Sequence, residues 1–114
     1  MDSKAYIRYK DDKAALESLV RVIGDSYRNC CIQTEIYEGM NLVDRYRNDY
    51  EDKKQFILKI QKGLPFCSRD TRIIIEHEVL TISESKWYTK YFTTSSYYRH
   101  KYKAYIEFLR CLDI

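Results

Sequence analysis

The sequence predicts an all-α protein, a helical bundle of about five helices in one domain. Three glycines and one proline are too few for the many tight turns of a β-sandwich or barrel. Hydrophobic residues make up 45% of the chain and charged residues 32%, a balance typical of one globular domain with a hydrophobic core. We treat residues 1–114 as a single domain with an N-terminal helical part over 1–67 and a second part over 68–114.

The first long helix is expected near residues 12–36. Apolar residues recur at helical spacing from Leu16 to Cys31. Asp12 precedes them, and aspartate is favourable at a helix N-terminus because its carboxylate accepts hydrogen bonds from free backbone N–H groups. Gly24 lies inside this stretch and costs about 1 kcal/mol of helix stability relative to alanine.

A second long helix is expected near residues 42–62. Asn41 and Asp44 resemble a helix-start box, with aspartate in place of the usual glutamate. Gly63 can take the left-handed conformation that ends many helices, and Pro65 cannot continue one. The end of this helix is therefore the best-defined boundary in the chain.

Three shorter helices are expected near 69–80, 84–91 and 96–111. Ile73–Ile75 would also suit a buried strand, but no second strand is available to pair with it, so we prefer a helix. The hydroxyl residues 93–96 supply an N-terminal cap for the last helix. We expect one core cluster from the apolar residues on the facing sides of the last two helices: Trp87, Phe92, Tyr97, Ala104 and Phe108.

The chain lacks the sequence patterns of an enzyme or a metal protein. It contains no glycine-rich phosphate loop, no G-x-S-x-G and no H-E-x-x-H. The spacings Cys67-x9-His77 and His100-x10-Cys111 do not fit zinc-ligand patterns. We therefore expect no catalytic residue, no cofactor, no metal and four free thiols. No apolar run suits a membrane span and no leader pattern follows Met1, so we expect a cytoplasmic protein without membrane contact.

Positive charge is concentrated at the C-terminal end. Residues 1–85 carry 14 basic and 15 acidic side chains, whereas residues 86–114 carry six basic and two acidic ones. No acidic residue occurs between Lys86 and Lys103. Such a segment is typical of a nucleic-acid contact or of a solvated helix face, and composition and spacing favour neither.

The order of elements over 84–112 matches a helix-turn-helix, in which the start of the second helix enters the major groove of DNA. Residues at that start are candidates for base contacts: Thr94, Ser95, Tyr98, Arg99 and Tyr102. Residues that flank it are candidates for phosphate contacts: Lys86, Lys90, Ser96 and Lys103. We expect Tyr98 and Tyr102 to lie on the face away from the core. A helical protein-interaction module that binds no nucleic acid is the alternative, and a single-strand binder with stacked tyrosines is a weaker third.

The segment from about Ser68 onward resembles the fourth region of bacterial sigma factors and phage regulators of the ArpU type. The similarity lies in Thr93-Thr94-Ser95-Ser96-Tyr97-Tyr98-Arg99 and Lys103-Ala104. The segment is also similar to small sigma-factor-like proteins of mycoplasmas, through Trp87-Tyr88, Tyr91 and the run from Tyr97 to Ala104. This resemblance implies a sigma region four-like helix-turn-helix in a transcriptional regulator. It also implies duplex DNA as a partner and RNA polymerase as a further candidate, while the oligomeric state stays open.

Overall fold

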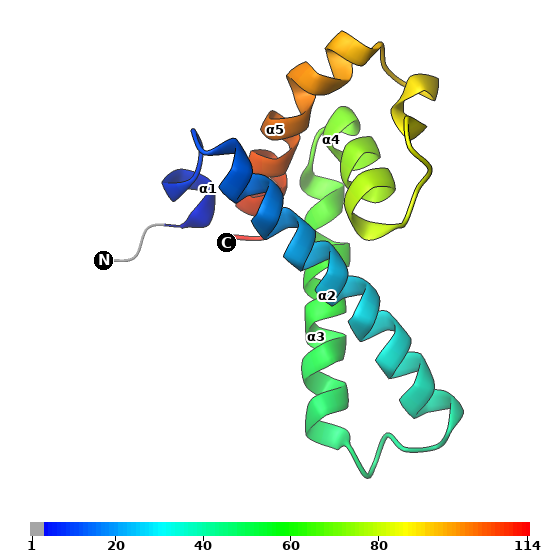
Figure 1. The fold of residues 1–114 in the computed structure, drawn as a ribbon. Coiled ribbons are helices and arrows are strands. Elements are labelled where there is room, and N and C mark those ends of the chain that lie inside the picture. The colour runs from blue at the N-terminus through cyan, green and yellow to red at the C-terminus, as the bar shows by residue number, and fades with distance from the viewer. Residues whose placement is uncertain (1–3) are drawn as a thin grey trace.

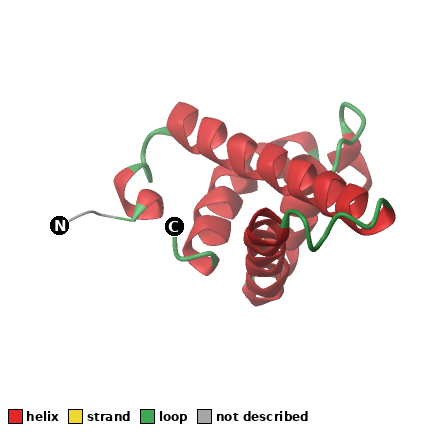
Figure 2. Ribbon diagram, turned by 90° about the horizontal axis from the view of Figure 1, so that it is seen from below, coloured by secondary structure: helices red, strands yellow, loops and turns green. Residues whose placement is uncertain are grey.

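The structure, a computed structural model of the chain, describes residues 4–114 and contains only helices and loops within that range (Figures 1 and 2). The all-α prediction is therefore confirmed. The expectation about a leader rests partly on residues 1–3, which lie outside the described range. The α-helices are α1 (Ala5–Arg8), α2 (Lys13–Gly39), α3 (Arg47–Gly63), α4 (Arg69–Ile74) and α5 (Thr94–Cys111). The shorter elements are the 3₁₀ turns η1 (Leu64–Phe66) and η3 (Trp87–Lys90) and the π-helix η2 (Ile75–Leu80).

The helices α2 and α3 form a long hairpin that projects from the rest of the molecule (Figure 1). As expected, Asp12 caps α2, and its carboxylate accepts a hydrogen bond of 3.0 Å from the backbone N–H of Ala15. The predicted start of the second helix at residue 42 is wrong, because α3 begins at Arg47. Asn41 has a left-handed φ of 56°, which differs from the extended backbone of an N-cap, and Asp44 pairs with Arg47 instead.

The helix α3 ends at Gly63 as predicted, but not by the expected mechanism. Gly63 has right-handed α geometry, with φ −76° and ψ −38°, so no left-handed cap forms. A Cβ atom at this position would lie 2.8 Å from Cδ2 of Leu112 and 3.3 Å from the carbonyl oxygen of Cys111. The glycine therefore allows the end of α5 to approach the end of α3.

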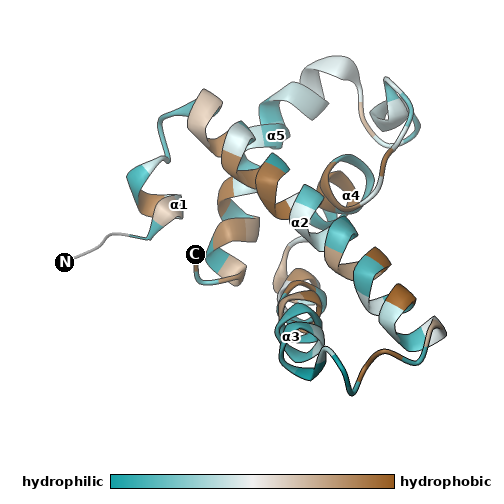
Figure 3. Ribbon diagram, turned by 60° about the horizontal axis from the view of Figure 1, so that its bottom comes forward, coloured by the Kyte–Doolittle hydropathy of each residue, from teal (hydrophilic) through white to brown (hydrophobic). Residues whose placement is uncertain are grey.

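One hydrophobic core joins the two parts of the chain. Its most deeply buried members include Leu16, Val20 and Ile60 from the first part and Ile74, Ile75, Phe108 and Leu109 from the second. Figure 3 shows apolar segments on each of the long helices that contribute to it. The helix α2 crosses η2 at Gly24, where a Cβ atom would lie 2.3 Å from the carbonyl oxygen of Val79. The two parts therefore share one core and pack closely against each other.

The predicted core cluster of the last two helices forms only in part. Ala104 and Phe108 belong to the central core, while Trp87 and Phe92 are half-buried against it. Tyr97 is buried beside that core, where its ring packs edge-on against Trp87 with centroids 5.7 Å apart and stacks on Tyr88 with centroids 4.0 Å apart.

The segment 69–80 is helical throughout, as predicted, although its second half is π-helical. Ser68 stands at the N-cap position of α4, but its side chain does not cap the helix. Glu107 of α5 does so instead, since its carboxylate accepts hydrogen bonds from the backbone N–H of Ser68 at 2.6 Å and the hydroxyl of Thr71 at 2.6 Å. This contact fixes the start of α4 against α5.

The helix predicted over 84–91 is wrong in length, because only the 3₁₀ turn η3 forms there. Lys86 has a left-handed φ of 61°, which prevents a helix from running through it. The last helix is confirmed, although α5 begins two residues before the predicted Ser96. Its cap is Thr93, whose hydroxyl oxygen accepts a hydrogen bond of 3.1 Å from the backbone N–H of Ser96.

Candidate nucleic-acid interface

The helix α5 has one buried face and one open face. Tyr97, Ala104 and Phe108 point into the molecule. Arg99 and Lys103 are four residues apart, lie on the same side of the helix and are exposed. The open face therefore carries two basic side chains about one helical turn apart.

Four basic side chains of this region have no acidic partner among residues 4–114. Among residues 4–114, no ion pair involves Lys86, Lys90, Arg99 or Lys103, and all four are exposed. Basic residues of α3 differ, since Lys53 pairs with Asp49 at 2.7 Å. Unpaired positive charge on a rigid helix attracts phosphate groups, because no internal contact has to break when they bind.

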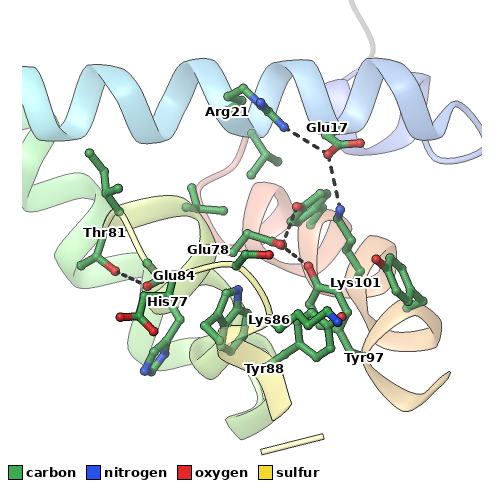
Figure 4. Close-up of a pocket in the computed structure, with 18 of the residues that line it drawn as sticks. Glu17, Arg21, His77, Glu78, Thr81, Glu84, Lys86, Tyr88, Tyr97 and Lys101 are labelled. Carbon is green, nitrogen blue, oxygen red and sulfur yellow. Dashed lines mark hydrogen bonds and ion pairs between the residues drawn. The ribbon is translucent and has the colours of Figure 1, made fainter. Parts of the chain in front are cut away.

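Glu78 holds the start of α5 against η2 (Figure 4). Its carboxylate accepts a hydrogen bond from the hydroxyl of Tyr97 and another, of 2.8 Å, from the hydroxyl of Tyr105. Burial raises the pKa of both tyrosines, and their hydrogen bonds to Glu78 raise it further. Both phenols therefore stay protonated as donors, and the buried face of α5 is fixed.

Stacked aromatic rings hold η3 in place. The ring of His77 stacks on Trp87, with centroids 5.0 Å apart and planes 15° apart. Nδ1 of His77 lies 3.0 Å from the carbonyl oxygen of Ile73, a contact that assigns its proton to Nδ1. Because Tyr88 stacks on Tyr97, η3 is tied to both η2 and α5. Lys90, at the end of η3, therefore has a fixed backbone position next to the start of α5.

The side chain of Lys101 points into the molecule, although Lys101 lies within the basic segment. Its side chain is only 12% exposed, and its ammonium lies 3.4 Å from the carboxylate of Glu17 on α2. Four tyrosine rings surround that ammonium with centroids within 6.0 Å, those of Tyr97, Tyr98, Tyr102 and Tyr105. This charge ties α5 to α2 and is not free for a phosphate.

The two tyrosines expected on the open face, Tyr98 and Tyr102, differ in how far they are exposed. Tyr98 is 55% exposed, as a contact residue must be. Tyr102 is half-buried against the core, and the ammonium of Lys13 lies 5.2 Å from its ring centroid. The prediction that Tyr102 faces away from the core is wrong, because the N-terminal end of α2 covers that side of α5.

The structure brings most of the other predicted residues to the first turns of α5. Thr94 and Ser95 are exposed there with Arg99, whereas Ser96 is half-buried. Lys86 lies outside α5, on the rim of a cleft of about 610 Å³ between α2, η2, η3 and α5 (Figure 4). Sequence reasoning missed Arg110, which is exposed seven residues after Lys103 and extends the same face by two turns. The seven-residue spacing between Lys103 and Arg110 is the sequence signal that could have placed Arg110 on this face.

Comparison with known proteins gives no independent assignment. No protein-family model matches the chain, and no curated protein or solved structure matches it. Within residues 4–114, no helix has the length and apolar character needed to cross a bilayer. The geometry of the chain itself therefore carries the functional argument.

Proposed function

We propose that the protein is a DNA-binding transcriptional regulator that contacts duplex DNA through the first half of α5. One observation carries this proposal. Arg99 and Lys103 are exposed and make no ion pair among residues 4–114, on a helix whose opposite face is fixed by Tyr97 and Glu78. A rigid basic helix of this kind meets the requirements of groove binding, since its side chains are already positioned when DNA arrives.

The dimensions of α5 suit the major groove. An α-helix with its side chains is about 10–12 Å wide, and the groove is about 12 Å wide. In this proposal Thr94, Ser95, Tyr98 and Arg99 reach base edges, because they lie exposed in the first two turns. The positive end of the helix dipole also favours phosphate groups near that end.

Phosphate contacts come from residues on either side of these turns. Lys90 precedes α5 and Lys103 follows one turn after Arg99, so the two ammonium groups flank the base-reading residues along the chain. The segment from α4 to η3 takes the supporting role that a first helix has in a helix-turn-helix. The resemblance to sigma region four supports this reading and is the reason for retaining RNA polymerase as a candidate partner.

A helical protein-interaction module is the second candidate. It is favoured by the exposed apolar residues Ile32, Ile36 and Met40, which lie on the projecting hairpin of α2 and α3. Binding of a protein to the hairpin would leave α5 without a role in recognition.

The test is a selection of binding sites from a pool of random duplexes. We expect an enriched sequence, and Arg99→Ala should cost about 1–3 kcal/mol of binding on that sequence and little on random DNA. Lys59→Ala is the matched control, because Lys59 is exposed on α3 and makes no ion pair among residues 4–114. A pool without enrichment, together with equal binding by wild type and the Arg99 variant, would refute the proposal.

A further inference from the structure

The outer face of α2 carries apolar side chains that no other described part of the chain covers. The inner face packs on α3, η2 and α5 through Leu16, Val20 and Ile23. On the opposite side, Val22 is 60% exposed and Ile36 is 47% exposed. Figure 3 shows apolar positions along the half of α2 that extends beyond the body. The same side also carries the exposed polar residues Asp25, Asn29 and Gln33, so its apolar side chains lie on either side of a polar centre.

We propose that this outer face binds a second copy of the chain, with the two α2 helices antiparallel and Asn29 on the twofold axis. A twofold interface joins one patch to itself, so the patch must be self-complementary. With Asn29 opposite its own copy, Val22 lies opposite Ile36 of the second copy. In the same register Asp25 lies opposite Gln33. Val22 and Ile36 thus form an apolar pair and Asp25 and Gln33 a polar one, while Met40 lies opposite Ser18 and Ile32 opposite Ser26.

Two charged residues beside this face favour the antiparallel direction. Arg21 and Glu35 lie on the same flank, and an antiparallel pairing brings Arg21 within about one turn of Glu35 in the second copy. Symmetry repeats this contact at the other end. Glu35 is exposed and makes no ion pair among residues 4–114, whereas the Arg21 side chain pairs with Glu17 at 3.2 Å and is still 70% exposed. In a parallel pair Arg21 would face Ser26 and Glu35 would face Met40, so no opposite charges would meet.

The size of the face predicts a weak dimer. The stretch from Ser18 to Met40 is about 33 Å long and about 10 Å wide. Such a footprint is about 330 Å² on each copy, below the roughly 800 Å² per partner of a standard interface, so we expect the dimer to be weak and transient. Because α2 contacts α5 through the ion pair of Glu17 and Lys101, the side of α5 that carries Arg99 stays open in the dimer. The inference does not depend on DNA binding, since the dimer forms without nucleic acid.

The first test is sedimentation of the full chain without DNA, under reducing conditions, from about 10 to 500 µM. We expect a monomer–dimer equilibrium that Ile36→Asp weakens at least about tenfold. Leu58→Asp is the matched control, because Leu58 is 38% exposed on α3 and lies outside the proposed interface. Thermal melts by circular dichroism check that both variants fold.

A charge swap tests the register. Arg21→Glu and Glu35→Arg should each weaken self-association, because like charges then meet at both ends of the interface. An equimolar mixture of the two variants should form a heterodimer at least as strong as the wild-type dimer. A monomer at every concentration would overturn the proposal and leave the face to a different protein. Self-association that Ile36→Asp leaves unchanged, or a mixture that does not pair, would overturn it as well.

Discussion

Replacement of Gly24 by alanine separates local helix propensity from tertiary packing. In an isolated helix the change stabilises by about 1 kcal/mol, because glycine is the poorer helix former. In this fold the new Cβ would lie 2.3 Å from the carbonyl oxygen of Val79 and 2.9 Å from its Cγ1. That carbonyl also accepts a hydrogen bond from Arg28, so it cannot rotate away without loss.

The expected change in stability for Gly24→Ala follows from these opposing effects. To reach an ordinary contact of 3.4 Å the crossing of α2 and η2 must widen by about 1 Å, so the cost lies near the upper end of overpacking, about 3 kcal/mol. After the gain in propensity of about 1 kcal/mol, Gly24→Ala should lose about 2 kcal/mol of stability. For a chain of this length that corresponds to a fall in Tm of roughly 6–12 °C.

The assay is urea and thermal unfolding followed by circular dichroism. Gly39→Ala is the control, since an added Cβ there meets no atom within 4 Å. It should be neutral or stabilising by up to about 1 kcal/mol. A Gly24→Ala variant as stable as wild type would show that α2 and η2 do not cross this closely, and would refute the packing described here.

Three further outcomes are expected. Phe108→Ala should cost about 3–5 kcal/mol in urea unfolding, because Phe108 is fully buried. For Glu107, burial raises the pKa but hydrogen bonds from Thr71 and Ser68 outweigh it and hold the pKa below its usual value. Stability from this group is therefore present above the unfolded pKa of about 4.3 and is lost as the pH falls, and Glu107→Gln should flatten the acid limb of a stability–pH curve. The raised pKa of Tyr97 and Tyr105 stabilises the fold below pH about 10 and ceases to do so at higher pH, so ultraviolet titration should show these two phenols ionising only as the protein unfolds.

Local signals predicted α2 and α5 well. Asp12 and Thr93 cap α2 and α5 through contacts within three residues, and such contacts depend on sequence neighbours alone. The buried stripe of α5 was also readable, because Tyr97, Ala104 and Phe108 recur at helical spacing. These elements carry the exposed residues Arg99 and Lys103, so that part of the candidate site could be placed before the structure was known.

What sequence reasoning missed depends on residues far apart in the chain. Gly63 is needed because Leu112, which lies 49 positions away in the sequence, packs where a Cβ atom would be. Glu107 caps α4 from another helix, and nothing in the sequence near Ser68 indicates an acceptor 39 positions away. Tyr102 was assigned to the open face because the approach of α2 over that side of α5 has no signature near residue 102. The element η3 is short because Lys86 has a left-handed φ. No residue preference in the sequence indicated that conformation.

The most direct test of DNA recognition by α5 is the salt dependence of duplex binding for two pairs of lysine variants. Lys90→Ala/Lys103→Ala removes the proposed phosphate contacts, and Lys59→Ala/Lys62→Ala removes equal charge from exposed positions on α3. Each lost phosphate contact lowers the slope of log K against log salt by about 0.9. We predict a slope reduced by about 2 for the first pair and unchanged for the second. Equal reductions for both pairs, or no duplex binding by the wild-type protein at low salt, would contradict the proposed role of α5.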